Sequence, residues 1–396
     1  MNFVMHNIFS HIVIHFDEIS LKGKNQGFFV EKLMNNVLQR LGNKFTAGRG
    51  AGKIFFKSNE LFGFDDFLKY SEKIKFVPGI SNFSPAIAVT SEIELIKAAV
   101  LQIVEFYNPR TFKVFTTRAC KDFPMTSMEV NQEIGGYVLE NNNEISVDVH
   151  EPELIVKIEI SKNKAWILGK KHPGIGGLPI GSVGRVVCLL SGGLDSPVAA
   201  FQMMKRGAEV IFIHFQNQTI NKSGVENKIF RLVEALSKIQ RGCKLLMVPF
   251  EDLQKQVISK VRSDLRMIVY RRLMFQISEQ LAKKEGAQAI VTGDSLAQVA
   301  SQTLENLAAI YHATSLLKLA PLISFNKTEI IELAKKIGTY DISIEPYGDC
   351  CNLLVAKHPE TRARLNEVLI AEKNAELTQG IEKAIAGTKV MEWRMF

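Results

Sequence analysis

The segment from Val186 to Pro197, VVCLLSGGLDSP, constrains the fold more than any other part of the chain. Its first five residues are apolar without alternation, which is typical of a strand buried on both faces of a parallel sheet. Two glycines bracketed by serines follow, and a helix-like run, PVAAFQMMKR, begins at Pro197. The order of strand, glycine-rich loop and helix predicts an α/β domain.

The glycine-rich loop, residues 191–196, has the composition of an anion-binding turn. Free backbone N–H groups and the positive end of a helix dipole attract phosphate there, and glycines let an anion approach the backbone. The hydroxyls of Ser191 and Ser196 can donate hydrogen bonds, and Asp195 can hold Mg²⁺ beside a polyphosphate. The loop is neither a Walker A loop nor G-x-G-x-x-G. A tight turn without a ligand is the alternative interpretation.

Composition narrows the class of protein. With 396 residues, 46% of them hydrophobic and 23% charged, the chain resembles an ordinary soluble protein of two or three domains. A net charge of +8 is compatible with an acidic partner. We expect a cytoplasmic protein without a membrane partner, since neither a long apolar segment nor a signal-peptide pattern is evident. Five cysteines without a C-x-x-C pair predict neither a disulfide framework nor a tightly bound metal.

The first 170 residues predict small α+β modules, because strand-like and amphipathic stretches alternate. In the clearest helix, apolar residues repeat every four positions from Phe29 to Leu41, and Gly42 supplies a stop signal. Another helix is expected to begin at Thr126, which forms a capping-box pattern with Glu129.

Two basic clusters in this region are candidate RNA contacts. Lys22 and Lys24 flank a glycine before the first helix, and Arg118 and Lys121 lie beside a strand and a turn with aromatic neighbours. A basic turn is also an ordinary solvated loop, so these residues alone do not distinguish the two interpretations.

The region after Gly184 repeats strand and helix patterns and predicts a doubly wound parallel sheet with its ligand at the strand carboxyl ends. The glycine- and proline-rich segment before it, residues 170–184, predicts a linker or an exposed loop. Arg271 and Arg272 on a later helix could reach polyphosphate, with a solvated helix face as the alternative. The expected strand ends are Leu190 with the glycine-rich loop, His214-Phe215, Pro249-Phe250 and Gly293-Asp294-Ser295.

Several stretches resemble one protein family. They are HFDEISLKGKN, RACKDFPMTSMEVNQEIG, GGLPIGSVGRVVCLLSGGLDSPVAA, TGDSLAQVASQTLENL and PYGDCCNLL. In this order they are similar to the tRNA 4-thiouridine synthetases, or tRNA sulfurtransferases (the ThiI family), and the loop resembles the PP-loop of ATP pyrophosphatases. The resemblance runs from about residue 10 to about residue 360. It implies an N-terminal ferredoxin-like domain (1–66), a tRNA-binding THUMP domain (67–172) and a doubly wound PP-loop catalytic domain (173–396) with a helical C-terminal tail.

The resemblance implies ATP-dependent sulfur transfer to tRNA. The uridine at position eight is adenylated on O4, and a cysteine persulfide then replaces AMP by sulfur to give 4-thiouridine. Cys351 matches the reactive cysteine, with Cys350 beside it; Lys327 would reach the adenylate, and Asp195 would position Mg²⁺. The implied ATP-binding residues are Leu189, Leu190, Ser191, Gly192, Gly193, Ser196, His214, Phe215, Arg271, Gly293 and Gln302.

Four of these side chains also have a structural interpretation. Cys350 and Cys351 could be small buried hydrophobic residues, Lys327 a surface lysine at a helix N-terminus, and Gln302 a helix-capping residue.

The implied sulfur source is a cysteine desulfurase, because 396 residues leave no room for the rhodanese domain of longer members. Those members supply sulfur for thiamine through that domain, so the sequence does not predict a thiamine role. The thiol that resolves the reactive cysteine is left open among Cys350, Cys243, Cys188 and an external reductant. A homodimer is left open as well.

Two other functions compete with sulfur transfer. A PP-loop amidotransferase or synthetase for a small molecule would not need the basic N-terminal region. A tRNA-binding protein with an inactive PP-loop would not need an intact Asp195 or the paired cysteines.

Overall fold

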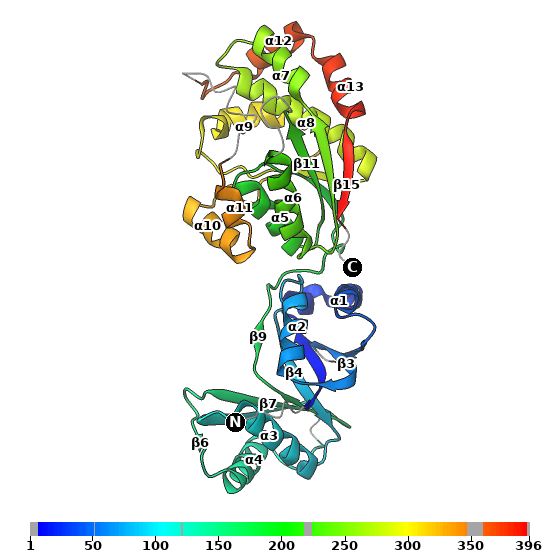
Figure 1. Ribbon diagram of the computed structural model, residues 1–396, viewed down its shortest axis with the longest axis vertical. Coiled ribbons are helices and arrows are strands. Elements are labelled where there is room, and N and C mark those ends of the chain that lie inside the picture. Colours follow the sequence, from blue (N-terminus) through cyan, green and yellow to red (C-terminus); the bar gives the residue numbers. More distant parts are fainter. Residues whose placement is uncertain (1–6, 51, 120–121, 218–223, 347–358, 394–396) are drawn as a thin grey trace. The chain divides into compact units, whose positions relative to one another are not determined.

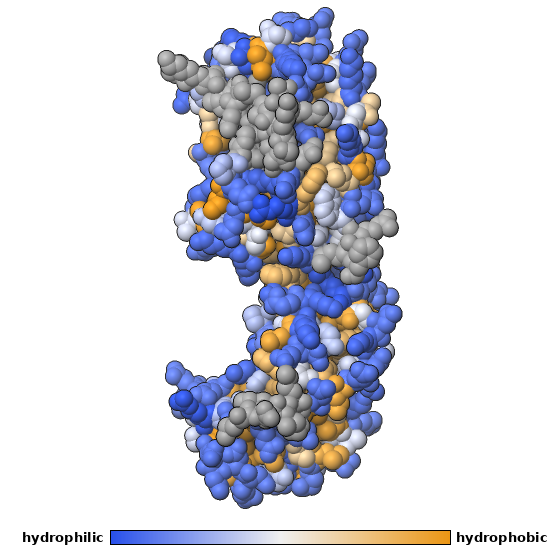
Figure 2. Space-filling model, viewed as in Figure 1, coloured by the Kyte–Doolittle hydropathy of each residue, from blue (hydrophilic) through white to orange (hydrophobic). Residues whose placement is uncertain are grey.

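The computed structural model describes residues 7–50, 52–119, 122–217, 224–346 and 359–393, and the chain divides into two compact units, residues 1–179 and 180–396 (Figure 1). On the side shown in Figure 2, hydrophilic residues predominate on each unit, and small apolar patches are scattered among these residues. Within the described ranges, none of the helices has the length and apolar character needed to cross a membrane.

The first unit is a sheet with strand order β2-β3-β1-β4-β8-β7-β5-β6, in which β9 also pairs with β4. Only the pairs of β5 with β6 and with β7 are parallel among those described. The strands are β1 (Phe9–His15), β2 (Phe45–Gly50), β3 (Lys53–Phe62), β4 (Asn82–Val89), β5 (Thr111–Arg118), β6 (Ser146–Val147), β7 (Leu154–Ile160), β8 (Ala165–Leu168) and β9 (His172–Pro173). The helices are η1 (Glu18–Asn25), α1 (Gln26–Leu41), α2 (Phe64–Ile74), α3 (Ile93–Tyr107) and α4 (Ser127–Asn141).

Two predicted helices of this unit are confirmed. Helix α1 buries residues at the predicted four-residue spacing, although Val30 rather than Phe29 begins the buried series. It ends at Gly42, whose φ of 81° favours glycine. In α4 both capping-box bonds form: Thr126 Oγ1 accepts from Glu129 N at 3.2 Å, and Glu129 Oε2 accepts from Thr126 N at 2.6 Å.

Residues 170–184, predicted as a linker or an exposed loop, contain the boundary between the two units after Pro179, but part of the segment packs into the first unit. Leu178 is only 2% exposed and belongs to the core of the first unit. The backbone N–H of Gly176 donates to Ile80 O at 2.7 Å. A side chain at Gly174 would place Cβ 2.2 Å from Ile80 O. Glycine therefore serves close backbone packing here, where the sequence pattern indicated a loose connection.

The second unit contains a sheet with strand order β14-β13-β10-β11-β12-β15, parallel except for the pair of β12 and β15. Strand order reverses between β10 and β13, and such a switch point is where open α/β sheets bind ligands. The strands are β10 (Arg185–Leu189), β11 (Glu209–Gln216), β12 (Cys243–Pro249), β13 (Ala289–Val291), β14 (Leu317–Leu319) and β15 (Lys389–Trp393). The helices are α5 (Asp195–Lys205), α6 (Gly224–Ser237), α7 (Glu251–Lys260), α8 (Arg266–Glu285), η2 (Ala300–Gln302), α9 (Leu304–Tyr311), α10 (Lys327–Lys336), α11 (Tyr340–Ile344), α12 (Leu365–Ala375) and α13 (Thr378–Ala386). The predicted doubly wound sheet is confirmed.

The predicted helical tail is correct only as far as α13. After Gly387 the chain forms β15, which runs antiparallel to β12 and pairs Trp393 with Cys243. A side chain at Gly387 would place Cβ 2.9 Å from Pro249 Cγ. Pairing with the edge of β12 overrides the local helical composition, because an uncovered edge leaves backbone groups without partners.

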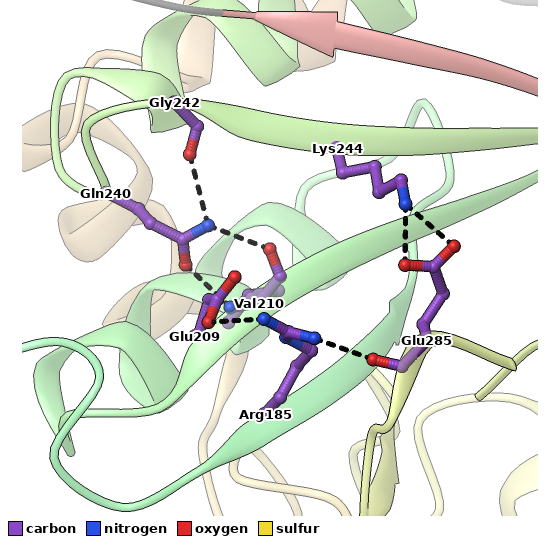
Figure 3. Close-up of polar contacts among 7 residues, drawn as sticks. All are labelled: Arg185, Glu209, Val210, Gln240, Gly242, Lys244 and Glu285. Atoms are coloured by element: carbon purple, nitrogen blue, oxygen red, sulfur yellow. Dashed lines mark hydrogen bonds and ion pairs between the residues drawn. The ribbon is translucent and has the colours of Figure 1, made fainter. Parts of the chain in front are cut away.

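Ion pairs and hydrogen bonds stabilise the amino ends of strands β10, β11 and β12 (Figure 3). The guanidinium of Arg185 donates to Glu285 O at 2.8 Å and lies 3.1 Å from the Glu209 carboxylate. Lys244 binds both carboxylate oxygens of Glu285, at 2.8 and 2.6 Å. These contacts join β10, β11 and β12 to the C-terminal end of α8.

A buried glutamine extends the ladder of β11 beyond the start of β12. Gln240 Oε1 accepts from Val210 N at 2.6 Å, and Gln240 Nε2 donates to Val210 O at 2.9 Å (Figure 3). Pairing of β11 with β12 begins one residue later, at Ile211. The side-chain amide therefore replaces a backbone partner that β12 does not supply.

Candidate active site

The glycine-rich loop connects β10 to α5 and is closed by its own serines. Ser196 Oγ accepts from Ser191 N at 2.9 Å and lies 3.0 Å from Ser191 Oγ. Ser191 Oγ in turn accepts from Gly193 N at 3.3 Å. The buried Gly192 and the exposed Gly193 form the turn itself. These bonds fix the loop at the N-terminus of α5, where backbone donors and the helix dipole favour an anion.

Gly293 brings the end of β13 against this helix start. A Cβ at position 293 would lie 2.8 Å from Ser196 N and 3.1 Å from Asp195 Cβ. Only glycine allows this approach, so two of the predicted strand ends meet at the switch point. Packing alone is sufficient reason for glycine here, independently of any nucleotide.

Two residues predicted to be catalytic, Lys327 and Asp195, contact each other beside the glycine-rich loop. Lys327 Nζ donates to Asp195 Oδ1 at 2.8 Å, and Gln298 Nε2 donates to Asp195 Oδ2 at 3.0 Å. Lys327 begins α10, as its surface interpretation predicted, and its side chain is 47% exposed. The structure therefore combines a helix-terminal lysine with a direct contact to the loop carboxylate.

A cavity of about 500 Å³ opens at the switch point beside this pair. Met267, Ile268 and Met274 of α8 contribute an apolar wall, and Pro359 and Glu360 lie at its rim. A concave, partly apolar site with a few polar groups is typical of a small-molecule pocket. Of the predicted ATP-binding residues, its lining includes Leu189, Ser191, Ser196, Arg271, Gly293 and Gln302.

Asp294 is the polar centre of the cavity wall, a role that the sequence did not indicate. It accepts from Gln302 Nε2 at 3.1 Å, and Arg271 Nη2 lies 2.7 Å from each of its oxygens. Thr292 and Tyr311 donate to it at 2.8 and 2.9 Å. Burial alone would raise the pKa of Asp294, but the arginine and these donors hold it below its usual value. The signal for this role in the sequence was the position of Asp294, an acid that closely follows a buried strand.

Arg272 lies on another face of α8. Its guanidinium pairs with Glu372, with Nε 2.8 Å from Oε1 and Nη2 3.0 Å from Oε2, and donates to Ala309 O. The side chain is 2% exposed. The interpretation that both arginines reach polyphosphate is therefore wrong for Arg272, which joins α8 to α12 and α9.

His214 and Phe215 at the end of β11 are buried and are not among the described residues that line this cavity. His214 Nδ1 lies 2.8 Å from Leu190 O, and Phe215 packs edge-on against Phe250 with ring centroids 5.0 Å apart. The structure thus places His214 against the backbone just before the loop and Phe215 against Phe250, and neither is among the described residues of the cavity lining.

The predicted reactive residues Cys350 and Cys351 lie outside the described residues. The chain before them is held by Lys228, a 4% exposed side chain on α6. Its ammonium donates to Ser343 O at 2.9 Å and to Glu345 O at 2.8 Å. A buried lysine therefore fixes the backbone just ahead of the cysteine segment.

Asn306 fixes the backbone that follows the same segment. This residue of α9 is fully buried. Its Nδ2 donates to Glu360 O at 2.8 Å and its Oδ1 accepts from Ala363 N at 3.0 Å. Because Glu360 also lines the cavity, the chain after the cysteines enters the cavity wall at a fixed point.

Asp195 fits a magnesium ion that is held jointly with phosphate. Magnesium takes oxygen ligands, commonly one or two carboxylates together with substrate phosphates and water. Asp195 offers one partly exposed carboxylate at the cavity. In the part of the chain that the structure describes, no three His, Cys, Asp or Glu side chains converge to hold a metal by themselves. Such an ion would therefore depend on the nucleotide for further ligands.

In the first unit, a hollow of about 680 Å³ lies on strands β2, β3 and β8 and the residues before β8. Phe55 and Trp166 stack in its lining with centroids 3.7 Å apart. Basic side chains with stacked aromatics are the usual composition of single-stranded RNA surfaces. We call this hollow the basic sheet face, after the lining residues Arg49, Lys53, Lys57, Lys162 and Lys164.

An internal acid organises the basic sheet face. Glu159 is 5% exposed and contacts His15 at 3.1 Å, Lys157 at 2.6 Å, and Lys53. Burial would raise the pKa of Glu159, but the three bases hold it well below its usual value. This carboxylate stays ionised and neutralises part of the local positive charge, and Arg49, Lys57, Lys162 and Lys164 are exposed cations of this face.

The structure places the predicted tRNA-binding residues elsewhere. Lys22 lies 5.2 Å from the Phe29 ring centroid, and Lys24 is exposed. Arg118 donates to two backbone carbonyls before α4, Phe123 O and Met125 O. The predicted residue at position 121, Lys121, is outside the described residues. A signal for the basic sheet face existed in the alternation of 53, 55 and 57, which puts those side chains on one side of β3.

A parallel sheet with a glycine-serine loop, an acid and a cavity at its switch point defines a PP-loop type of α/β domain, here joined to an α+β unit with a basic face. Family models agree with this class. They match the Thiamine biosynthesis protein (ThiI) at residues 181–377, the THUMP domain at 89–168 and the ThiI ferredoxin-like domain at 11–84. The domain composition expected from the sequence is confirmed.

Full-length relatives give the particular family. The probable tRNA sulfurtransferase of Moorella thermoacetica is 38% identical over 386 residues, 97% of this chain and 98% of that protein. That of Oceanobacillus iheyensis is 38% identical over 389 residues, 97% and 96% of the two chains. A crystal structure of a 4-thiouridine synthetase–RNA complex with bound ATP matches with a TM-score of 0.88 and 35% identity, covering 97% of this chain and 99% of that one. The chain belongs to the tRNA sulfurtransferase family and is a transferase.

Proposed function

We propose that the chain catalyses ATP-dependent conversion of the uridine at position eight of tRNA to 4-thiouridine. The observation that carries the proposal is the contact of Lys327 with Asp195 at a cavity beside the glycine-rich loop. A similar 4-thiouridine synthetase binds RNA and ATP. The cavity of this chain accordingly takes ATP, and Asp195 would hold Mg²⁺ when the nucleotide is bound.

In the first step, uracil O4 attacks the α-phosphorus of ATP, the bond to pyrophosphate breaks, and the uracil N3 proton is lost. The loop residues Ser191, Gly192, Gly193 and Ser196 and the start of α5 cradle the departing pyrophosphate. Lys327 lies close enough to neutralise phosphate charge. When bound, magnesium would neutralise further charge on the phosphate oxygens.

In the second step, the terminal sulfur of a persulfide on Cys351 attacks C4 and AMP leaves. A second thiolate then attacks the Cys351 sulfur, which forms a disulfide and leaves the transferred sulfur on uracil. A cysteine desulfurase supplies the persulfide. The charged and hydrogen-bonding side chains around the cavity act in the adenylation step. The sulfur-transfer step depends on the cysteines, so the two steps depend on different residues.

Burial argues against two candidates for the resolving thiol. Cys188 is fully buried in β10 and Cys243 is 5% exposed in β12. Burial raises the pKa of each thiol to about 12, so almost none is thiolate at neutral pH. Cys350 and an external reductant remain as the alternatives.

The first unit delivers tRNA, with the basic sheet face as its phosphate-binding surface. Lys22, Lys24, Arg118 and Lys121 stay predictions as further contacts. The domain ranges 1–66, 67–172 and 173–396, a cytoplasmic location and a homodimer also stay predictions.

One assay tests the proposal. Unmodified tRNA is incubated with the protein, ATP, Mg²⁺, cysteine and a cysteine desulfurase, and nucleosides are analysed by mass spectrometry for 4-thiouridine. A product dependent on ATP supports the proposal. Bound tRNA without thiouridine would instead indicate a binding protein with an inactive PP-loop.

The same assay identifies the reactive cysteine. We expect Cys351→Ala to abolish thiouridine while pyrophosphate release continues. If Cys350→Ala abolishes the product and Cys351→Ala does not, Cys350 is the sulfur carrier and our choice between the two is wrong.

A further inference from the structure

Helix α8 carries two adjacent arginines that pair with carboxylates in different ways. Arg272 uses two nitrogens, Nε and Nη2, against the two oxygens of Glu372. Arg271 uses Nη2 alone against both oxygens of Asp294. Neither member of the first pair is among the described residues that line the cavity, whereas both members of the second pair line it. Adjacent helix residues point in different directions, which gives two matched ion pairs on one element.

The contacts of Asp294 leave it little capacity to bind a ligand directly. Its Oδ1 accepts from Arg271 and Gln302, and its Oδ2 accepts from Arg271, Thr292 and Tyr311. A carboxylate has about four lone-pair sites, and this one is 3% exposed. Asp294 therefore acts on the cavity through the side chains that it holds.

The negative charge of Asp294 changes what Arg271 can do. The pair is neutral as a whole, so Arg271 attracts a polyanion less than a free arginine would. Its Nη1 makes only a long 3.4 Å contact with Ser301 O, so N–H groups remain for a ligand. Arg271 thus offers donors in a fixed direction without a net charge.

We propose that Asp294 is a positioning residue for the adenylation step. It fixes the direction of the Arg271 guanidinium and the Gln302 amide at the cavity wall, and it cancels the arginine charge so that ATP is oriented rather than simply held. The inference rests on the proposed function, since it takes ATP as the occupant of the cavity.

Substitution of Asp294 by Asn tests this role, because Asn keeps the size of the side chain and removes its charge. Arg271 then becomes a free cation beside the phosphates. We expect kcat for tRNA-dependent pyrophosphate release to fall at least tenfold while KM for ATP stays equal or decreases. The Kd for ATP, measured by equilibrium dialysis, should depend more steeply on salt than in the wild type.

Glu372→Gln is the matched control, because it breaks the comparable pair of Arg272 outside the cavity. It should lower thermal stability and leave kcat, KM and the salt dependence within twofold of the wild type. If Asp294→Asn does not fold, Tyr311→Phe removes one donor to Asp294 from a residue that does not line the cavity. It should lower kcat two- to fivefold with KM unchanged.

The inference is overturned if folded Asp294→Asn has a kcat within twofold of the wild type, or if its KM for ATP rises while kcat is preserved. Equal kinetic effects of Asp294→Asn and Glu372→Gln would likewise reduce Asp294 to a structural role. Failure of the proposed function has a different signature. If the wild type binds ATP but makes no thiouridine, the salt dependence of the Kd for ATP can still be compared among the wild type, Asp294→Asn and Glu372→Gln.

Discussion

Lys327 and Asp195 contact each other at 2.8 Å, although 132 residues separate them in the chain. Each is the first residue of a helix, α10 and α5. The helix dipole stabilises an acid at such a position and destabilises a base. Asp195 therefore offsets the unfavourable position of the lysine and holds its ammonium group beside the cavity.

We expect Asp195→Asn to lower tRNA-dependent pyrophosphate release by about 100-fold or more, because the charge beside the phosphates is lost. The dissociation constant for tRNA, measured by filter binding, should stay within twofold of the wild type. A parallel loss of tRNA affinity would show that Asp195 supports the fold instead.

Lys57→Ala and Lys164→Ala should each weaken tRNA binding and lower the slope of log K against log salt by about one. Both side chains are exposed on the basic sheet face. Lys69→Ala is the matched control, because Lys69 is an exposed lysine of α2 outside this face. Binding isotherms at several salt concentrations give the slopes, and equal slopes in all three variants would contradict the assignment of the surface.

His11 should make the first unit less stable in acid. Burial, with Lys164 and Lys57 nearby, lowers the pKa of His11 to about 4, whereas an unfolded histidine titrates near 6.5. Between these values the unfolded chain binds the extra proton, so the free energy of unfolding falls as pH drops from 6.5 to 4, by up to about 3 kcal/mol.

Urea unfolding of wild type and His11→Gln at several pH values isolates this contribution. The stability difference between the two proteins should change through that pH window and be constant above it. A difference that does not vary with pH would mean that folding leaves the pKa of His11 unchanged.

Gln240→Met should lower the free energy of unfolding of the second unit by about 1–3 kcal/mol, because buried backbone groups of Val210 lose their partner. The residue is 7% exposed and lies at the amino ends of the strands. Urea midpoints measure the loss, and KM for ATP should not change. A raised KM would mean that the amino ends of the strands influence the cavity.

Asn306→Leu should uncouple the two steps of the reaction. The variant releases the backbone at Glu360 and Ala363, after the cysteine segment, and at Ala300 in the cavity wall, while the loop and the Asp195–Lys327 contact stay intact. We expect thiouridine formed per pyrophosphate released to fall at least threefold. If both products decline by the same factor, Asn306 supports the whole unit rather than the sulfur step.

The sequence predicts what is encoded locally. Uninterrupted apolar strands and the serine-glycine loop indicate the parallel sheet and its switch point, and the capping box of Thr126 indicates the start of α4. Helical spacing also implies separate directions for Arg271 and Arg272, although both were expected to reach polyphosphate. Contacts between distant segments were not predictable in this way. Asp294 accepts hydrogen bonds from four elements or loops, and the basic sheet face combines several strands with a loop.

The last strand, β15, makes the timing of synthesis matter for the second unit. It covers the outer edge of β12. Strand β12 ends at Pro249, and β15 begins 140 residues later, at Lys389. At about 5–20 residues per second, a ribosome needs roughly 7 to 28 s to make that interval. Throughout this interval, the β12 edge of the nascent chain has no β15 to pair with. Neighbouring nascent chains on the same messenger can pair with that edge until the C-terminal residues emerge and cover it.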